Sequence, residues 1–240
     1  MKAFSITDIG KVRSVNQDYV FRSENAIGHL SNLFLVADGM GGHKAGDLAS
    51  RYCVELMTEQ VKKSSFRTPV SILEEAIQVA NEGVQRKALT SMDYEGMGTT
   101  LVAATFAGNE LYIANIGDSR AYLVGKEMKQ ITEDHSLVEA MVKNGGIERK
   151  DAKSHPNKNI ITRALGTNRI VQADFFELSV GPEDVILMCS DGLTNMIDDD
   201  ELYEILQNGK DNLEITARKL IETANQYGGR DNISVILIQP

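Results

Sequence analysis

The sequence is short of several residue types, and each shortage excludes a class of protein. It has two cysteines, Cys53 and Cys189, which lack the CxxC spacing of a thiolate zinc site. Two cysteines are also too few for a disulfide framework, which favours a reducing compartment. No apolar run approaches the ~18 residues of a membrane span, and no apolar signal region follows Met1. We therefore expect a cytoplasmic protein with no membrane insertion.

Positive charge is also scarce. The 25 Lys and Arg residues are outnumbered by 34 Asp and Glu residues, which gives a net charge of −9 and a pI near 5.0. This balance argues against nucleic acid as the main partner, because a phosphate backbone requires clustered Lys and Arg. No linker, low-complexity tract or internal repeat divides the chain, so we expect a single domain over residues 1–240. No feature of the sequence indicates an obligate oligomer, and we expect a monomer.

The residue pattern alternates between blocks of strands and pairs of helices. Apolar and β-branched runs predict strands at residues 4–8, 19–22, 33–37, 99–106, 110–115, 120–124, 171–178, 185–188 and 233–238. Helical spacing predicts helices at residues 47–63, 70–89, 136–144, 199–207 and 213–227. The runs between residues 99 and 124 indicate an antiparallel meander, and the polar segment 145–159 indicates an irregular lid. Together they predict an α+β fold in which two sheets pack face to face with helices outside.

Five aspartates spread along the chain each lie beside small or turn-forming residues: Asp18, Asp38, Asp118, Asp191 and Asp231. Three of them follow apolar runs, and a carboxylate at the end of a buried strand is costly unless a positive charge compensates it. Because few basic residues lie nearby, divalent cations are the expected compensation. Oxygen ligands are typical of Mg²⁺ or Mn²⁺, and Gly39 would let its backbone carbonyl approach such an ion. One Asp-Gly pair alone would indicate only a turn after a strand.

Arg13 lies five residues before Asp18, in a polar stretch that we interpret as a turn between two strands. A guanidinium group suits the capture of two phosphate oxygens. Without the aspartates, Arg13 would be interpreted as a solvated turn residue. With them, the pattern predicts metal-assisted attack on a phosphorus or carbonyl centre, in which two cations activate a water between them.

Eight short motifs occur in a fixed order along the chain. They are Arg13-x-x-Asn16-x-Asp18, Asp38-Gly39-Met40-Gly41-Gly42-His43, Gly98-Thr99-Thr100, Gly117-Asp118-Ser119-Arg120, Asp134-His135-Ser136, Arg163-Ala164-Leu165-Gly166, Ser190-Asp191-Gly192-Leu193 and Gly229-Arg230-Asp231-Asn232. In order and spacing they resemble the motifs of the metal-dependent Ser/Thr protein phosphatases of type 2C, in the bacterial form.

The resemblance implies a four-layer αββα sandwich with a flap near residues 145–160. It further implies that Asp38, Asp191 and Asp231 hold one Mn²⁺ or Mg²⁺ ion, and that Asp18, Asp38 and the Gly39 carbonyl hold a second. Asp118, together with Asp191, would hold a weaker third ion, and Arg13 would bind the phosphoryl group.

The activity that the resemblance implies is hydrolysis of phosphoserine and phosphothreonine in intracellular proteins. A hydroxide that bridges the metals would attack phosphorus directly, without a phospho-enzyme. By the same analogy, a bacterial Ser/Thr protein kinase and its targets are the expected partners.

Met40 departs from the eukaryotic relatives, which carry a histidine as candidate general acid at this position. Loss of a general acid costs ~10²–10⁴-fold in rate. His43 and His155 are candidate substitutes that could touch the substrate. Both could equally be surface residues, His43 at a helix start and His155 in the flap, and we expect His135 to be structural.

Two other hypotheses remain open. The chain could be a partner-switch module that binds a phosphoprotein and turns over poorly, in which case Asp191→Ala would leave its function intact. It could also be an acidic cation-binding structural domain, which would show metal-dependent stability without phosphatase activity. The second alternative does not account for Arg13.

Overall fold

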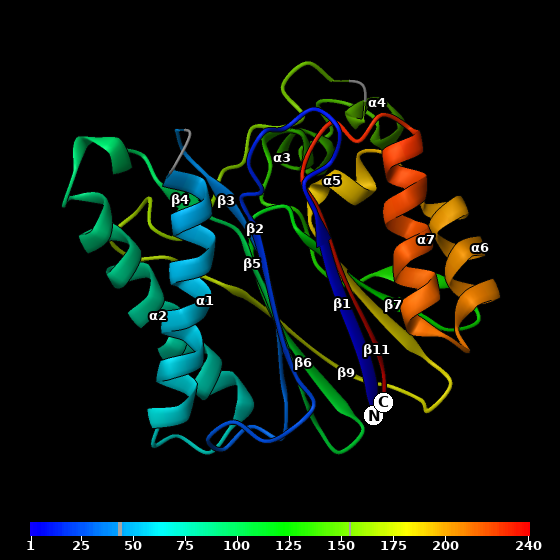
Figure 1. Cartoon of the computed structure of the whole chain (residues 1–240), viewed down its shortest axis with the longest axis horizontal. Helices are drawn as coiled ribbons and strands as arrows, with labels where there is room; N and C mark the ends of the chain where they lie inside the picture. Colours follow the sequence, from blue (N-terminus) through cyan, green and yellow to red (C-terminus); the bar gives the residue numbers. More distant parts are fainter. Residues whose placement is uncertain (43–44, 154) are drawn as a thin grey trace.

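Two antiparallel sheets lie face to face at the centre of the computed structural model, which describes residues 1–42, 45–153 and 155–240 (Figure 1). The first sheet has the order β1 (Lys2–Asp8), β11 (Ile233–Gln239), β10 (Val185–Cys189), β7 (Arg120–Val124) and β8 (Met128–Gln130). The second has the order β2 (Asp18–Ser23), β3 (Leu33–Met40), β5 (Leu101–Ala107), β6 (Glu110–Ile116) and β9 (Asp174–Ser179), with β4 (Gly98–Thr99) paired to β3.

A pair of helices covers the outer face of each sheet (Figure 1). Helices α1 (Ala45–Lys63) and α2 (Pro69–Ala88) pack on the second sheet, and α6 (Asp199–Gly209) and α7 (Leu213–Gln226) pack on the first. A third apolar cluster fills the space between the sheets, where Phe34 and Phe106 meet edge to face. This arrangement confirms the predicted α+β fold and the αββα sandwich.

Local signals account for the helix boundaries. The helix α2 begins at Pro69, the first-turn position that proline favours, and the side chain of Thr68 caps it. Asn212 caps α7 in the same way, through a hydrogen bond from the backbone N–H of Ile215. Both helices therefore begin within one residue of the predicted positions.

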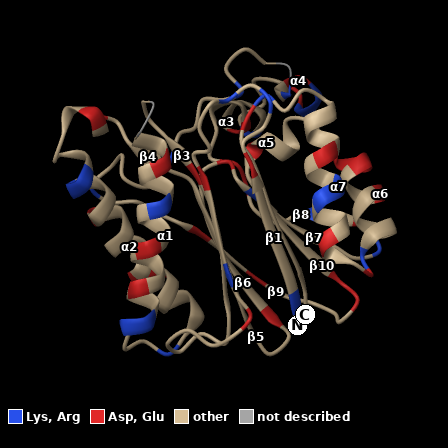
Figure 2. Cartoon of the chain, in the orientation of Figure 1, with Lys and Arg blue, Asp and Glu red and all other residues tan. Residues whose placement is uncertain are grey.

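The strand pairing brings distant aspartates together. In the antiparallel pair of β2 and β3, Asp18 lies directly opposite Asp38. Asp191 follows β10, Asp118 follows β6, and Asp231 precedes β11. Acidic residues therefore gather at one end of the strands, between the two helix pairs (Figure 2).

Several predicted elements are wrong in detail. Residues 120–124 do not continue the meander of β5 and β6, because the turn at Gly117 (φ +105°) carries the chain across to the other sheet, where β7 pairs with β10. Val171 is buried but precedes β9, and its carbonyl accepts a hydrogen bond from the side chain of Gln78 instead of a strand neighbour.

Three short helices and one strand were not predicted as such. The lid contains the four-residue helix α4 (Arg149–Ala152) after α3 (Leu137–Lys143), so it is not wholly irregular. The other three unpredicted elements are η1 (Met92–Tyr94), β8 and α5 (Asp191–Thr194). None of the helices within the described residues is long and apolar enough to cross a membrane.

Candidate active site

Asp18 is the most deeply buried of the five aspartates. The hydroxyl of Ser190 donates a 2.6 Å hydrogen bond to its Oδ2, while its Oδ1 is buried without a hydrogen-bond partner. Burial raises the pKa of Asp18 to about 7, and the nearby charges of Asp191 and Asp231 add to the rise. Without a positive partner, this carboxylate is costly in its charged form.

Asp38 lies in β3, two residues before the strand ends at Met40, and hydrogen bonds of its backbone hold it in place. Its N–H donates to Oγ1 of Thr100 at 3.0 Å, and its carbonyl accepts from the backbone N–H of Thr100 at 2.8 Å and from Oγ1 of Thr99 at 3.0 Å. Burial, followed by the charges of Asp18 and Asp191, holds the pKa of Asp38 well above its usual range. The two threonines therefore hold the backbone of Asp38 in place.

Gly39 follows Asp38 at a very close approach between two segments. A side-chain carbon at this position would lie 2.0 Å from the backbone oxygen of Gly46, in the first turn of α1. Only glycine therefore allows the start of α1 to pack against the end of β3. This packing holds the Asp38-Gly39 backbone against a helix N-terminus.

Asp191 and Asp118 are neighbours at the ends of different strands. Burial and the charge of Asp231 raise the pKa of Asp191 to about 6, and Nδ2 of Asn195 donates to its Oδ2 at 2.8 Å. Burial and the charge of Asp191 raise the pKa of Asp118 to about 8. The two carboxylates therefore disfavour each other's charged forms.

Asp231 is paired with the one arginine that the sequence singled out. Nη2 of Arg13 lies 2.8 Å from Oδ2 of Asp231. The loop that carries Arg13 is held against the segment before β11, because the side-chain amide of Asn232 donates to the carbonyls of Ile9 and Val15 at 2.9 and 3.0 Å. The two segments lie side by side at the top of Figure 1.

The donor set fits a hard divalent cation. All five groups offer carboxylate oxygen, repel one another and include a buried oxygen without a partner. In the part of the chain that the structure describes, no three His, Cys, Asp or Glu side chains already stand in the geometry of a metal site. Three of the aspartates instead accept hydrogen bonds from protein side chains: Asp18 from Ser190, Asp191 from Asn195, and Asp231 from Arg13.

A cavity of about 290 Å³ opens beside Asp118 and Asp191. Its lining also includes Arg149 of the flap and the ion pair of Arg120 with Asp134, whose atoms approach to 2.7 Å. The flap is tied down by Arg149, whose guanidinium donates to both carboxylate oxygens of Glu139 at 2.5 and 2.8 Å. A substrate at the carboxylates would therefore meet the flap.

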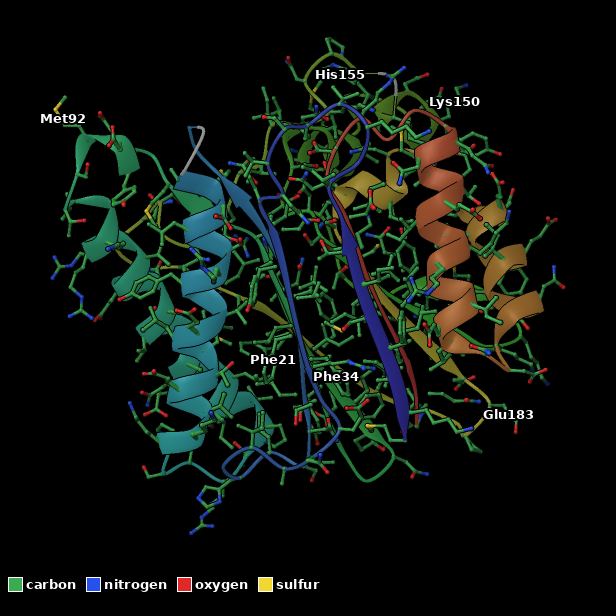
Figure 3. The ribbon with its side chains drawn as sticks, in the orientation of Figure 1. Phe21, Phe34, Met92, Lys150, His155 and Glu183 are labelled. Carbon is green, nitrogen blue, oxygen red and sulfur yellow. The ribbon has the colours of Figure 1, made fainter. Side chains whose placement is uncertain are left out.

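The histidine predictions have different outcomes. His43 lies outside the described residues. His155 follows α4 in the flap (Figure 3), where its backbone N–H donates to the carbonyl of Ala152 at 3.2 Å and its Nδ1 accepts a 3.1 Å hydrogen bond from the backbone N–H of Asn157. His155 is not among the residues that line the cavity. His135 is structural: it is buried and hydrogen-bonded to Gly117 and Asp174.

Ser190 and Asn195 were missed by the sequence reasoning. Both contact candidate metal ligands. The signal that could have identified them was their position relative to Asp191, since Ser190 lies one residue before it and Asn195 one helical turn after it. The helical turn was not predicted, so the second relationship could not be inferred.

Comparison with known proteins agrees with this geometry. A family model described as Protein phosphatase 2C matches residues 11–234. The chain belongs to the protein phosphatase 2C family. It is 44% identical over 240 residues to the serine/threonine phosphatase stp of Listeria innocua, and the match covers 97% of this chain and 93% of the relative.

Solved structures are similar over nearly the whole chain. The serine/threonine phosphatase of S. agalactiae superposes with a TM-score of 0.91 at 36% identity, covering 98% of both chains. The catalytic domain of the phosphatase PstP, in complex with two manganese ions, has a TM-score of 0.86 at 33% identity and covers 98% of this chain and 96% of that one. The protein is therefore a bacterial-type, metal-dependent Ser/Thr phosphatase whose substrates are phosphoproteins.

Proposed function

We propose that this phosphatase hydrolyses phosphoserine and phosphothreonine at the aspartate cluster, in a single catalytic domain over residues 1–240. The observation that carries the assignment of the site is the convergence of five carboxylates from five separate segments, with Asp18 opposite Asp38 in the sheet. Such a concentration of buried negative charge has little structural value without cations.

The ligand sets follow the family resemblance and are part of the proposal. Asp38, Asp191 and Asp231 would hold one ion, and Asp18, Asp38 and the Gly39 carbonyl would hold the second. A third and weaker ion would lie at Asp118, with Asp191. The manganese pair in PstP supports two ions of Mn²⁺ or Mg²⁺. When bound, these cations would activate a water for direct attack on phosphorus and offset the charge of the phosphate.

The chain's own residues would then bind and orient the substrate. Arg13 would bind the phosphoryl oxygens, since its guanidinium already lies at the rim of the site and is half exposed. The flap around Arg149 would contact the protein that carries the phosphate. Met40 supplies no proton, so another group would protonate the leaving oxygen, and His43 and His155 are the candidates that the sequence offers.

The biological setting is proposed by analogy with the relatives. We propose that the enzyme acts as a monomer in the cytoplasm and opposes a Ser/Thr protein kinase on shared targets. The two free, buried thiols of Cys53 and Cys189 support a reducing compartment.

Hydrolysis of p-nitrophenyl phosphate and of a phosphothreonine peptide tests the proposal. The purified chain is stripped with EDTA and titrated with Mn²⁺, and Mn²⁺ binding is followed in parallel by calorimetry. We expect saturable turnover that returns with Mn²⁺ and that falls to the rate of the buffer blank in Asp38→Ala, Asp191→Ala and Asp231→Ala.

The matched control is Asp211→Ala, which removes an exposed aspartate in the turn between α6 and α7. It should retain wild-type turnover and Mn²⁺ binding. Mn²⁺ binding without turnover in the wild type would instead favour the partner-switch hypothesis.

A further inference from the structure

One oxygen of the Asp18 carboxylate is held by a hydroxyl whose orientation is fixed. Oγ of Ser190 accepts a 3.0 Å hydrogen bond from the backbone N–H of Ser234, and donates its single proton to Oδ2 of Asp18 at 2.6 Å. Ser190 and Ser234 are fully buried, so water does not compete for these bonds. The rotamer of Asp18 is therefore set from β11 through Ser190.

The second oxygen of Asp18 is left for another ligand. Its Oδ1 is buried and has no hydrogen-bond partner within the described residues. A buried carboxylate oxygen without a partner calls for an explanation, and a bound ion is one of the few available. Ser190 thus binds one oxygen and leaves the other without a hydrogen bond.

Asp191 has an equivalent arrangement within α5. Asn195 lies one helical turn after Asp191. The backbone N–H of Asn195 donates to the Asp191 carbonyl at 2.8 Å, and its side-chain Nδ2 donates to Oδ2 of Asp191 at 2.8 Å. Ser190 and Asn195 are both neutral donors. They orient the two carboxylates without neutralising them, whereas Arg13 brings a positive charge to Asp231.

We propose that Ser190 and Asn195 are positioning residues that set the affinity for the divalent cation by orienting Asp18 and Asp191. This inference rests on the proposed function, because it takes those aspartates as metal ligands. Residues that hold metal ligands from behind typically contribute 10–100-fold to metal affinity or activity. Both act through an aspartate and need not touch the substrate.

The decisive variant is Asn195→Ala, because Asn195 is exposed and its removal leaves the core intact. Calorimetric titration of the EDTA-stripped chain should give a Mn²⁺ Kd raised by about 10-fold. The melting temperature in EDTA should stay at the wild-type value, while the increase caused by a fixed Mn²⁺ concentration becomes smaller. The matched control is Asn168→Ala, which removes an exposed asparagine whose side-chain amide nitrogen donates to Oγ1 of its neighbour Thr167 at 3.4 Å. This variant should retain the wild-type Kd.

Ser190→Ala tests the second residue by a double-mutant cycle. It should raise the Mn²⁺ Kd in the wild-type chain and have no further effect in an Asp18→Ala background, which has no side-chain acceptor for Ser190 to orient. Because Ser190 is buried, thermal unfolding of the Ser190→Ala protein in EDTA shows whether the variant folds. If it does not fold, Asn195→Ala alone decides the inference.

A wild-type Kd in Asn195→Ala, or a loss that Asn168→Ala reproduces, would overturn the inference and leave the proposed function standing. A wild-type chain that neither binds Mn²⁺ nor hydrolyses p-nitrophenyl phosphate would overturn both.

Discussion

Nη2 of Arg13 and Oδ2 of Asp231 lie 2.8 Å apart, so residues separated by 218 positions meet in one ion pair. The pair joins the expected phosphate-binding group to an expected metal ligand. A guanidinium has five donors, so Arg13 can keep contact with Asp231 while it binds phosphate oxygens.

Arg13→Ala should mainly raise KM, by about 10-fold or more, because it removes binding that the substrate phosphate already has in the ground state. Steady-state hydrolysis of p-nitrophenyl phosphate at saturating Mn²⁺ measures this. Arg51→Ala, which removes an exposed arginine of α1, is the control. Equal losses in the two variants would refute the role of Arg13.

Gly39→Ala should destabilise the protein by about 1–3 kcal/mol, because the new methyl group would lie 2.0 Å from the backbone oxygen of Gly46. Urea unfolding measures the change. Gly42→Ala is the matched substitution three residues later, where, apart from its chain neighbours, no atom of the described residues lies within 4 Å of the added carbon. It should stay within about 0.5 kcal/mol of wild type. A tolerated Gly39→Ala would show that α1 is not held against Asp38 and Gly39 as described.

The buried His135 should make stability depend on pH. Its Nδ1 accepts from the backbone N–H of Gly117 at 3.0 Å, so the other nitrogen carries the proton and donates to Asp174. Burial lowers the pKa of His135 below its usual 6.5. Below pH 6.5 the unfolded chain therefore binds a proton that the folded chain resists, and this contribution to stability is lost as pH falls.

The comparison of wild type with His135→Asn, which keeps an acceptor for Gly117, isolates this titration. The difference in melting temperature should favour wild type at pH 7.5 and shrink at pH 5.5. A difference that grows on acidification would mean that His135 becomes charged in the folded protein.

Prediction from sequence succeeded where the signal is local. The helix over residues 70–89 is observed at Pro69–Ala88, since its start is marked by Thr68 and Pro69 and its buried face by regular spacing. Prediction failed where the chain passes from one sheet to the other. Residues 120–124 have strand character in either sheet, and their sequence does not reveal that β7 pairs with β10.

The same division applies to the site. The aspartates and Arg13 could be predicted as candidate site residues because each follows a recognisable pattern. Asn195 was missed because a four-residue helix such as α5 has too few residues to show periodicity.

By itself the sequence determined which residues are the candidates for the chemistry, because Asp-Gly pairs after apolar runs and an arginine in a polar turn are local features. Only the tertiary structure decided which of these residues meet. Asp18 lies opposite Asp38, and Ser190 reaches Asp18 across 172 positions, because strand pairing and register depend on the packing of the whole chain.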